Sequence, residues 1–91
     1  MQDMRTFSNG EDQPTVIDVA RARKSLPNSA VRRQIRQHAG VSQWDLGRWL
    51  GVTGACVSLW ERENGGREPR GVRLVRYVDL LKELADIGGA G

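Results

Sequence analysis

The chain has 91 residues, enough for one domain with a modest core and little room for an enzyme cleft. Its single cysteine, Cys56, excludes an internal disulfide and a cysteine metal cluster, and no apolar run approaches the roughly 20 residues of a membrane span. The net charge of +3 is concentrated in residues 21–76, which hold 12 Arg or Lys against four acids, whereas both ends are acidic. An arginine-rich body suits a polyanion, although basic surfaces are also common without one.

The first expected helix follows a polar segment. Residues 1–14 are acidic, lack the pattern of a signal peptide and are predicted to be a flexible arm. Thr15 is suited to cap a helix that ends before Pro27, because the residue before a proline disfavours helical geometry. The residues at helical spacing in this segment are Val16, Val19, Ala20, Arg23 and Leu26.

A second helix is expected between a cap at Asn28 or Ser29 and a stop at Gly40. Four-residue steps place its apolar residues on one face, namely Val31, Ile35 and Ala39. Its arginines are then predicted to point elsewhere, namely Arg32, Arg33 and Arg36.

Two short helices are predicted next, with almost nothing between them. Ser42 caps the first, and Asp45 is placed to return the hydrogen bond to the Ser42 amide. Gly51 stops this helix, and Thr53 caps the next, which runs to about Arg62. Hydrophobic staples are expected between Val41 and Leu46 and between Val52 and Val57. A three-residue turn led by glycine between short amphipathic helices is typical of a helix-turn-helix.

The last predicted helix opens at Pro69, after a loop over 63–68. Its apolar stripe is broader than one small core needs, and consists of Val72, Val75, Val78, Leu81 and Leu84, widened by Leu74, Tyr77 and Leu80. Residues 88–91 are predicted to be a flexible tail. We therefore expect an all-α domain over 15–87, a compact bundle of four to five helices.

Residues 31–84 resemble the Cro/repressor-type helix-turn-helix family of phages and bacteria. The resemblance is carried by Ile35-Arg36, Ala39-Gly40-Val41-Ser42-Gln43, Leu46-Gly47, Leu50-Gly51-Val52-Thr53, Val57-Ser58, Trp60-Glu61-Arg62 and Pro69. The later runs 67–71 and 76–77 look like actinobacterial and actinobacteriophage members. The resemblance implies that the second helix of the motif enters the DNA major groove.

The resemblance also implies roles for individual residues. Ser42 and Gln43, at the start of the first motif helix, would hold a phosphate, with further phosphate contacts from Arg32, Arg33, Arg48, Arg62, Arg67 and Arg70. The positions that face bases in the family are Thr53, Gly54, Ala55, Ser58 and Leu59. Glu61 would help to close the loop after the reading helix.

This reading helix departs from the usual pattern, because base-pair recognition favours Arg, Lys, Asn or Gln. Its small tip and Leu59 leave two interpretations open: readout through thymine methyl groups, Ser58 and close backbone approach, or loss of DNA reading in favour of a protein-binding face. Trp60 is predicted to be core and Cys56 half-buried. Trp44 and Trp49 are predicted to be partly exposed, as a partner surface or covered by the N-terminal helix, which we favour.

The sequence thus favours a transcriptional regulator, a repressor or Cro-like protein that binds double-stranded DNA as a homodimer. An antitoxin or other protein-interaction module, and a DNA-bending recombination accessory, remain alternatives. We expect no enzyme activity, cofactor, metal or membrane contact, because no catalytic set or ligand spacing is present. The expected location is the cytoplasm, at the nucleoid or in the host of a phage.

Overall fold

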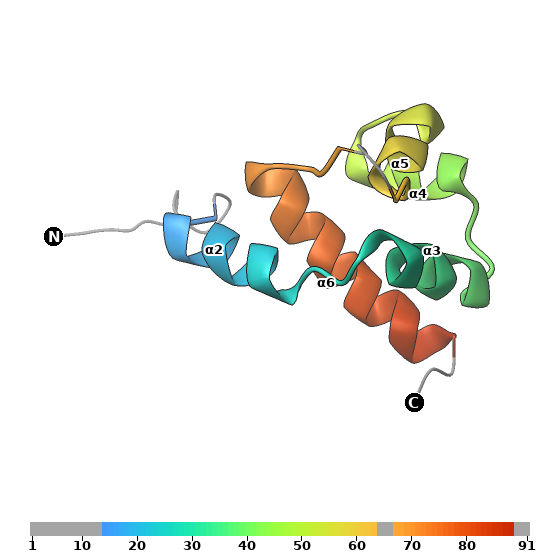
Figure 1. The fold of residues 1–91 in the computed structure, drawn as a ribbon, viewed down its shortest axis with the longest axis horizontal. Helices are drawn as coiled ribbons and strands as arrows, with labels where there is room; N and C mark the ends of the chain where they lie inside the picture. Colours follow the sequence, from blue (N-terminus) through green and yellow to red (C-terminus); the bar gives the residue numbers. More distant parts are fainter. Residues whose placement is uncertain (1–13, 64–66, 89–91) are drawn as a thin grey trace, which may run out of the picture.

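A long C-terminal helix runs through the middle of the molecule and the other helices pack around it (Figure 1). The computed structural model describes residues 14–63 and 67–88. These residues form helices only: α2 (Val16–Ser25), α3 (Ser29–His38), α4 (Gln43–Leu50), α5 (Gly54–Trp60) and α6 (Gly71–Ile87). The expectation of a small all-α bundle is confirmed. The predicted flexibility of residues 1–13 and 89–91 concerns positions outside the described residues.

Side-chain caps begin four of the helices, at the positions that the sequence predicts. The oxygen atoms of Thr15, Asn28, Ser42 and Thr53 each accept a hydrogen bond from the backbone amide three residues later, over 3.0 to 3.1 Å. At α2 the bond is returned by Asp18, whose carboxylate accepts from the Thr15 amide at 3.0 Å. These local bonds satisfy helix-end amides and set where each helix starts.

The core consists of two clusters along α6. The larger joins α4, α5 and α6 through Leu46, Leu50, Val57, Trp60, Tyr77, Leu81 and Leu84. Within it the rings of Trp60 and Tyr77 lie 5.0 Å apart between centroids, which confirms Trp60 as core. The smaller cluster joins α2 to α6 through Ala22, Leu74 and Val78. Cys56 is half-buried beside the larger cluster, as predicted.

Two helix predictions are corrected. The last helix begins at Gly71 rather than Pro69, because Arg70 is still extended, with φ −131° and ψ 158°, and Pro69 is buried before it. In α2 the buried residue is Ala22, which packs against Leu74 and Val78, whereas Val16 on the predicted face is exposed. A small side chain at the contact allows two helices to approach closely, so packing on α6 decided which face of α2 is buried.

The apolar stripe of α6 is largely used within the chain itself. Leu74 and Val78 are covered by α2, and Tyr77, Leu81 and Leu84 by the other helices. Leu80 stays half-buried and Ile87 is 72% exposed. Gly88, assigned to the tail, instead ends α6 by donating its amide to the Leu84 carbonyl at 2.9 Å. No helix in the described part of the chain is both long and apolar enough to span a bilayer.

Candidate functional site

The pair α4–α5 is held at a fixed angle by a tight turn over residues 51–53. Gly51 ends α4 in the left-handed region at φ +76°, and the Val52 amide donates to the Gly47 carbonyl at 2.8 Å. A Cβ atom on Gly47 would lie 2.7 Å from the Val52 carbonyl oxygen. Because real Cβ atoms do not approach backbone so closely, glycine at position 47 allows the turn to lie directly on α4.

The N-terminal end of α5 lies against the first turn of α4. A Cβ atom on Gly54 would lie 3.3 Å from the Trp44 Cα and backbone nitrogen atoms. Gly54 is therefore half-buried for packing, rather than open for the close approach of a ligand. Of the predicted base-facing residues, Thr53 and Ala55 are exposed, whereas Ser58 and Leu59 are half-buried.

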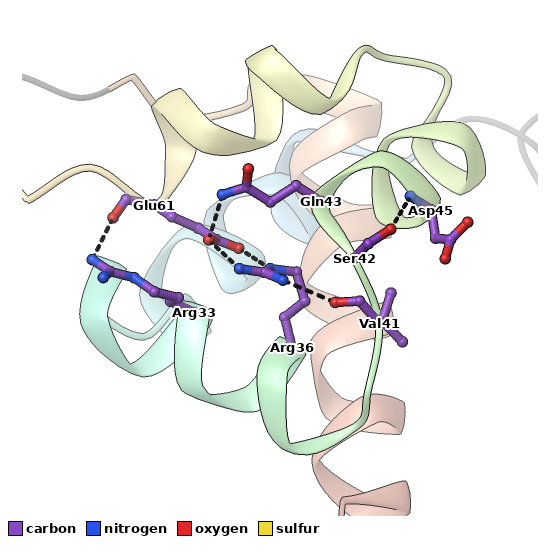
Figure 2. Close-up of polar contacts among 7 residues, drawn as sticks. All are labelled: Arg33, Arg36, Val41, Ser42, Gln43, Asp45 and Glu61. Carbon is purple, nitrogen blue, oxygen red and sulfur yellow. Dashed lines mark hydrogen bonds and ion pairs between the residues drawn. The ribbon is translucent and has the colours of Figure 1, made fainter.

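A buried ion pair connects the end of α5 to α3 and α4 (Figure 2). Glu61 is only 2% exposed, and its carboxylate accepts from Arg36 Nε at 2.6 Å and Nη2 at 2.9 Å. Arg36 Nη1 also donates to the Val41 carbonyl at 2.9 Å, and Gln43 Nε2 donates to Glu61 Oε1 at 3.1 Å. Such a two-pronged pair is strong and directional. Arg36, predicted to point away from the core, is thus buried, because it pairs with Glu61 across the bundle.

A polar hollow of about 560 Å³ opens beside this network. It is lined by Arg33, Arg36, Gln37, Ser42, Gln43, Ser58, Glu61 and Arg62. The start of α4 faces it, where first-turn amides lack helical partners and the helix dipole is positive. Arg33 is held at its rim by donating to the Glu61 carbonyl at 3.4 Å, and Arg62 is exposed. The structure therefore brings together four predicted anion-binding residues, Ser42, Gln43, Arg33 and Arg62.

Arg32 does not belong to this set. It is only 4% exposed, and its Nη2 pairs with Glu68 at 3.4 Å. Nε and Nη1 of Arg32 are buried without a hydrogen-bond partner. A guanidinium buried this deeply cannot reach a DNA phosphate, so the prediction that Arg32 contacts a phosphate is wrong.

The remaining predicted arginines lie elsewhere on the surface. Arg48 and Arg70 line a second hollow, of about 510 Å³, between the end of α4 and the start of α6. Sequence reasoning missed Arg73 there, which donates to the carbonyls of Leu50 and Gly51 at 3.4 and 3.5 Å and so caps α4. The one sequence signal for Arg73 is its position on the polar side of the last helix, outside the apolar stripe. Arg67 is exposed, with its amide donating to the Leu59 carbonyl at 3.3 Å.

Both surface tryptophans are uncovered by the described residues. Trp44 is 61% exposed, with the Arg48 guanidinium 4.8 Å from its ring centroid, and Trp49 is 79% exposed. The prediction that the N-terminal helix covers them is wrong, because α2 packs on α6. Large exposed aromatic side chains are typical of contact surfaces.

Among the described residues no group of three or more His, Cys, Asp or Glu could hold a metal ion. Burial raises the pKa of Tyr77 to about 12, and its hydroxyl lies in the core away from the hollows described above. Comparison with family models, with curated proteins and with solved structures finds no match to this chain.

Proposed function

We propose that this protein is a sequence-specific DNA-binding regulator that reads the major groove with α5 and holds phosphates at the start of α4. The observation that carries the proposal is the convergence of Ser42, Gln43, Arg33 and Arg62 on one hollow beside α5. A phosphate there would meet helix-end amides and two arginines, while α5 lies alongside. In this proposal α4 is the first helix of a helix-turn-helix and α5 is its second, reading helix.

The buried pair of Arg36 and Glu61 supports this proposal by holding the phosphate-binding residues in place. Gln43 Nε2 donates one hydrogen to Glu61 at 3.1 Å, which fixes the side chain, and the amide nitrogen carries a second hydrogen available to a ligand. The reading face then relies on Thr53, Ala55 and Ser58, with small side chains that suit thymine methyl contacts. We propose a homodimer on a two-fold operator, because one short helix contacts few bases.

The test is selection of short random duplexes by the purified protein, followed by sequencing, at low and near-physiological salt. We expect a motif with two-fold symmetry that persists at the higher salt. Gln43→Ala should weaken binding to all sequences, whereas Ser58→Ala should change the preferred bases. Asp86→Ala, at an exposed position of α6, is the control. If neither variant changes affinity for the selected duplex, this reading face is incorrectly assigned.

A protein-binding module on the same fold is the second candidate. It is favoured by the exposed Trp44 and Trp49 and by the half-buried Leu59 on α5. Motif-free binding that disappears as salt rises would support this candidate, because a basic surface alone gives only polyanion binding. A DNA-bending accessory would instead show a position-dependent shift in a circular-permutation gel assay.

A further inference from the structure

One side of α6 carries a stripe of four exposed residues around Leu80, which packs at the edge of the core. Spacings of three and four residues place them on one face of the helix. This α6 stripe consists of Arg73, Arg76, Leu80, Glu83 and Ile87. Leu80 is half-buried and the other four residues are exposed. The spacing is that of a seam between two packed helices. The end of α4 contacts it at Arg73, whereas Arg76, Glu83 and Ile87 stay exposed.

Trp49 lies along this stripe and extends it. Trp49 lines the 510 Å³ hollow together with Arg73 and Arg76, and it also lines a 630 Å³ hollow together with Leu80 and Leu84. The two hollows therefore meet at Trp49 and form one surface between α4 and α6. That surface is basic toward the start of α6 and apolar in its middle.

The charges along the stripe are complementary to those of the same stripe on an antiparallel copy of α6. Arg76 precedes Leu80 by four residues and Glu83 follows it by three. Across residues 14–63 and 67–88 the ion pairs are Arg32 with Glu68 and Arg36 with Glu61, so Arg76 and Glu83 have no charged partner there. An antiparallel copy whose two-fold axis passes between positions 79 and 80, next to Leu80, would place each Arg76 opposite the Glu83 of the other chain. A two-fold axis makes that contact twice.

We propose that the α6 stripe and Trp49 form the interface for a second copy of this chain, with the two α6 helices antiparallel about an axis next to Leu80. The inference rests on the proposed function for its role, since it supplies the dimer that a two-fold operator needs. A DNA backbone would fit the stripe less well, because Glu83 would repel phosphates and the exposed Ile87 would have no apolar partner. A second copy satisfies both the charges and the apolar residues.

The apolar centre of the proposed interface is small, which limits how tightly the copies associate. Leu80, Ile87 and Trp49 supply its apolar centre, and an indole alone buries about 150–250 Å². Arginine and tryptophan are enriched at such surfaces. Interfaces below about 1,200 Å² associate reversibly and in a concentration-dependent way, and we expect this behaviour here. Dimer formation is therefore measured by sedimentation equilibrium across a wide concentration range, without DNA.

Charge reversal tests the proposed pairing directly. Arg76→Glu alone places glutamate opposite Glu83 twice, and Glu83→Arg alone places arginine opposite Arg76 twice. Each single variant should raise the dimer dissociation constant by about tenfold or more at low salt. An equimolar mixture of the two single variants should form a heterodimer at least as well as the wild type, because every pair is then attractive. The double variant R76E/E83R should also regain self-association.

Matched controls reverse charges on α6 outside the stripe. Lys82→Glu and Asp86→Arg change charge by the same amounts and should leave the dissociation constant within about twofold, while circular dichroism checks that every variant is folded. A wild type that stays monomeric at millimolar concentration, or single variants that dimerise like the wild type, would overturn the inference. The charge-swap pattern without DNA binding would refute only the proposed function, and a two-fold DNA motif without the pattern would refute only this interface.

Discussion

Glu61 and Arg36 carry opposite charges into the interior and satisfy each other there. Two hydrogen bonds join them, and Arg36 and Glu61 hold the Val41 carbonyl and Gln43, respectively. Removing one partner of a buried pair leaves the other charge uncompensated. A substitution at Arg36 or Glu61 should therefore also disturb the start of α4.

We expect Glu61→Ala to lower the free energy of unfolding by about 3–5 kcal/mol, because Arg36 would remain buried without a counter-charge. Urea unfolding followed by circular dichroism measures the change. Glu63→Ala, at an exposed position nearby, is the control and should change stability by less than about 0.5 kcal/mol. Equal effects of the two substitutions would contradict the structural role of Glu61.

Tyr77 gives a pH dependence whose sign follows from its burial. Its pKa is raised to about 12 in the folded chain, above the usual value of 10.0. The unfolded chain loses this proton first, so the stability contribution is complete below pH 10 and is lost as pH rises toward 12. Tyr77 is the single tyrosine, so its absorbance change at 295 nm reports the titration directly. A midpoint near pH 10 in the folded protein would contradict the burial of its hydroxyl.

Tyr77→Phe should remove this alkaline loss of stability. The Tyr77 hydroxyl is buried without a hydrogen-bond partner, so the substitution breaks no bond. At neutral pH we expect the free energy of unfolding to be unchanged or to rise by about 1 kcal/mol. Urea unfolding at pH 7 and pH 11 measures both effects, and a clear loss of stability at pH 7 would indicate that the hydroxyl has a partner.

At the scale of elements, the contact between the 51–53 turn and α4 sets the orientation of α5 relative to α4. Gly47→Ala would place a methyl group 2.7 Å from the Val52 carbonyl oxygen, where backbone must move. We expect a loss of about 1–3 kcal/mol in the free energy of unfolding. Ala20→Gly, at an exposed position of α2, is the reverse exchange away from this contact and should cost about 1 kcal/mol. A stabilising effect of Gly47→Ala, as helix propensity alone predicts, would contradict the tight packing.

At the scale of the whole molecule, the positions of arginines around α5 should determine how the proposed DNA binding depends on salt. Arg62→Ala should lower the slope of log affinity against log salt by about 0.9, because one phosphate contact is lost. Arg23→Ala removes the same charge from α2 and should leave the slope unchanged. Gel-shift titrations at several salt concentrations on the selected duplex measure both. An equal fall in slope for the two variants would mean that only net charge matters.

Local patterns in the sequence determined the presence of the helices and the starts of four of them. Thr15, Asn28, Ser42 and Thr53 cap α2 to α5 as predicted, because a cap bond spans only three residues and needs no distant partner. The glycine stops and the buried Trp60 follow from the same local rules. For the site, the grouping of Ser42 and Gln43 at a helix start was equally predictable.

Long-range packing decided what the sequence alone could not. The sequence predicts that Arg32 and Arg36 lie on the surface, yet both are buried. Arg32 finds its counter-charge in Glu68, 36 residues away, and Arg36 finds its counter-charge in Glu61, 25 residues away. The buried side of α2 and the exposure of Trp49 depend on which helix α2 meets, and helical periodicity alone does not specify a partner. Helix boundaries are thus set by bonds between neighbours in sequence, whereas burial and charge pairing are set by residues that only the fold brings together.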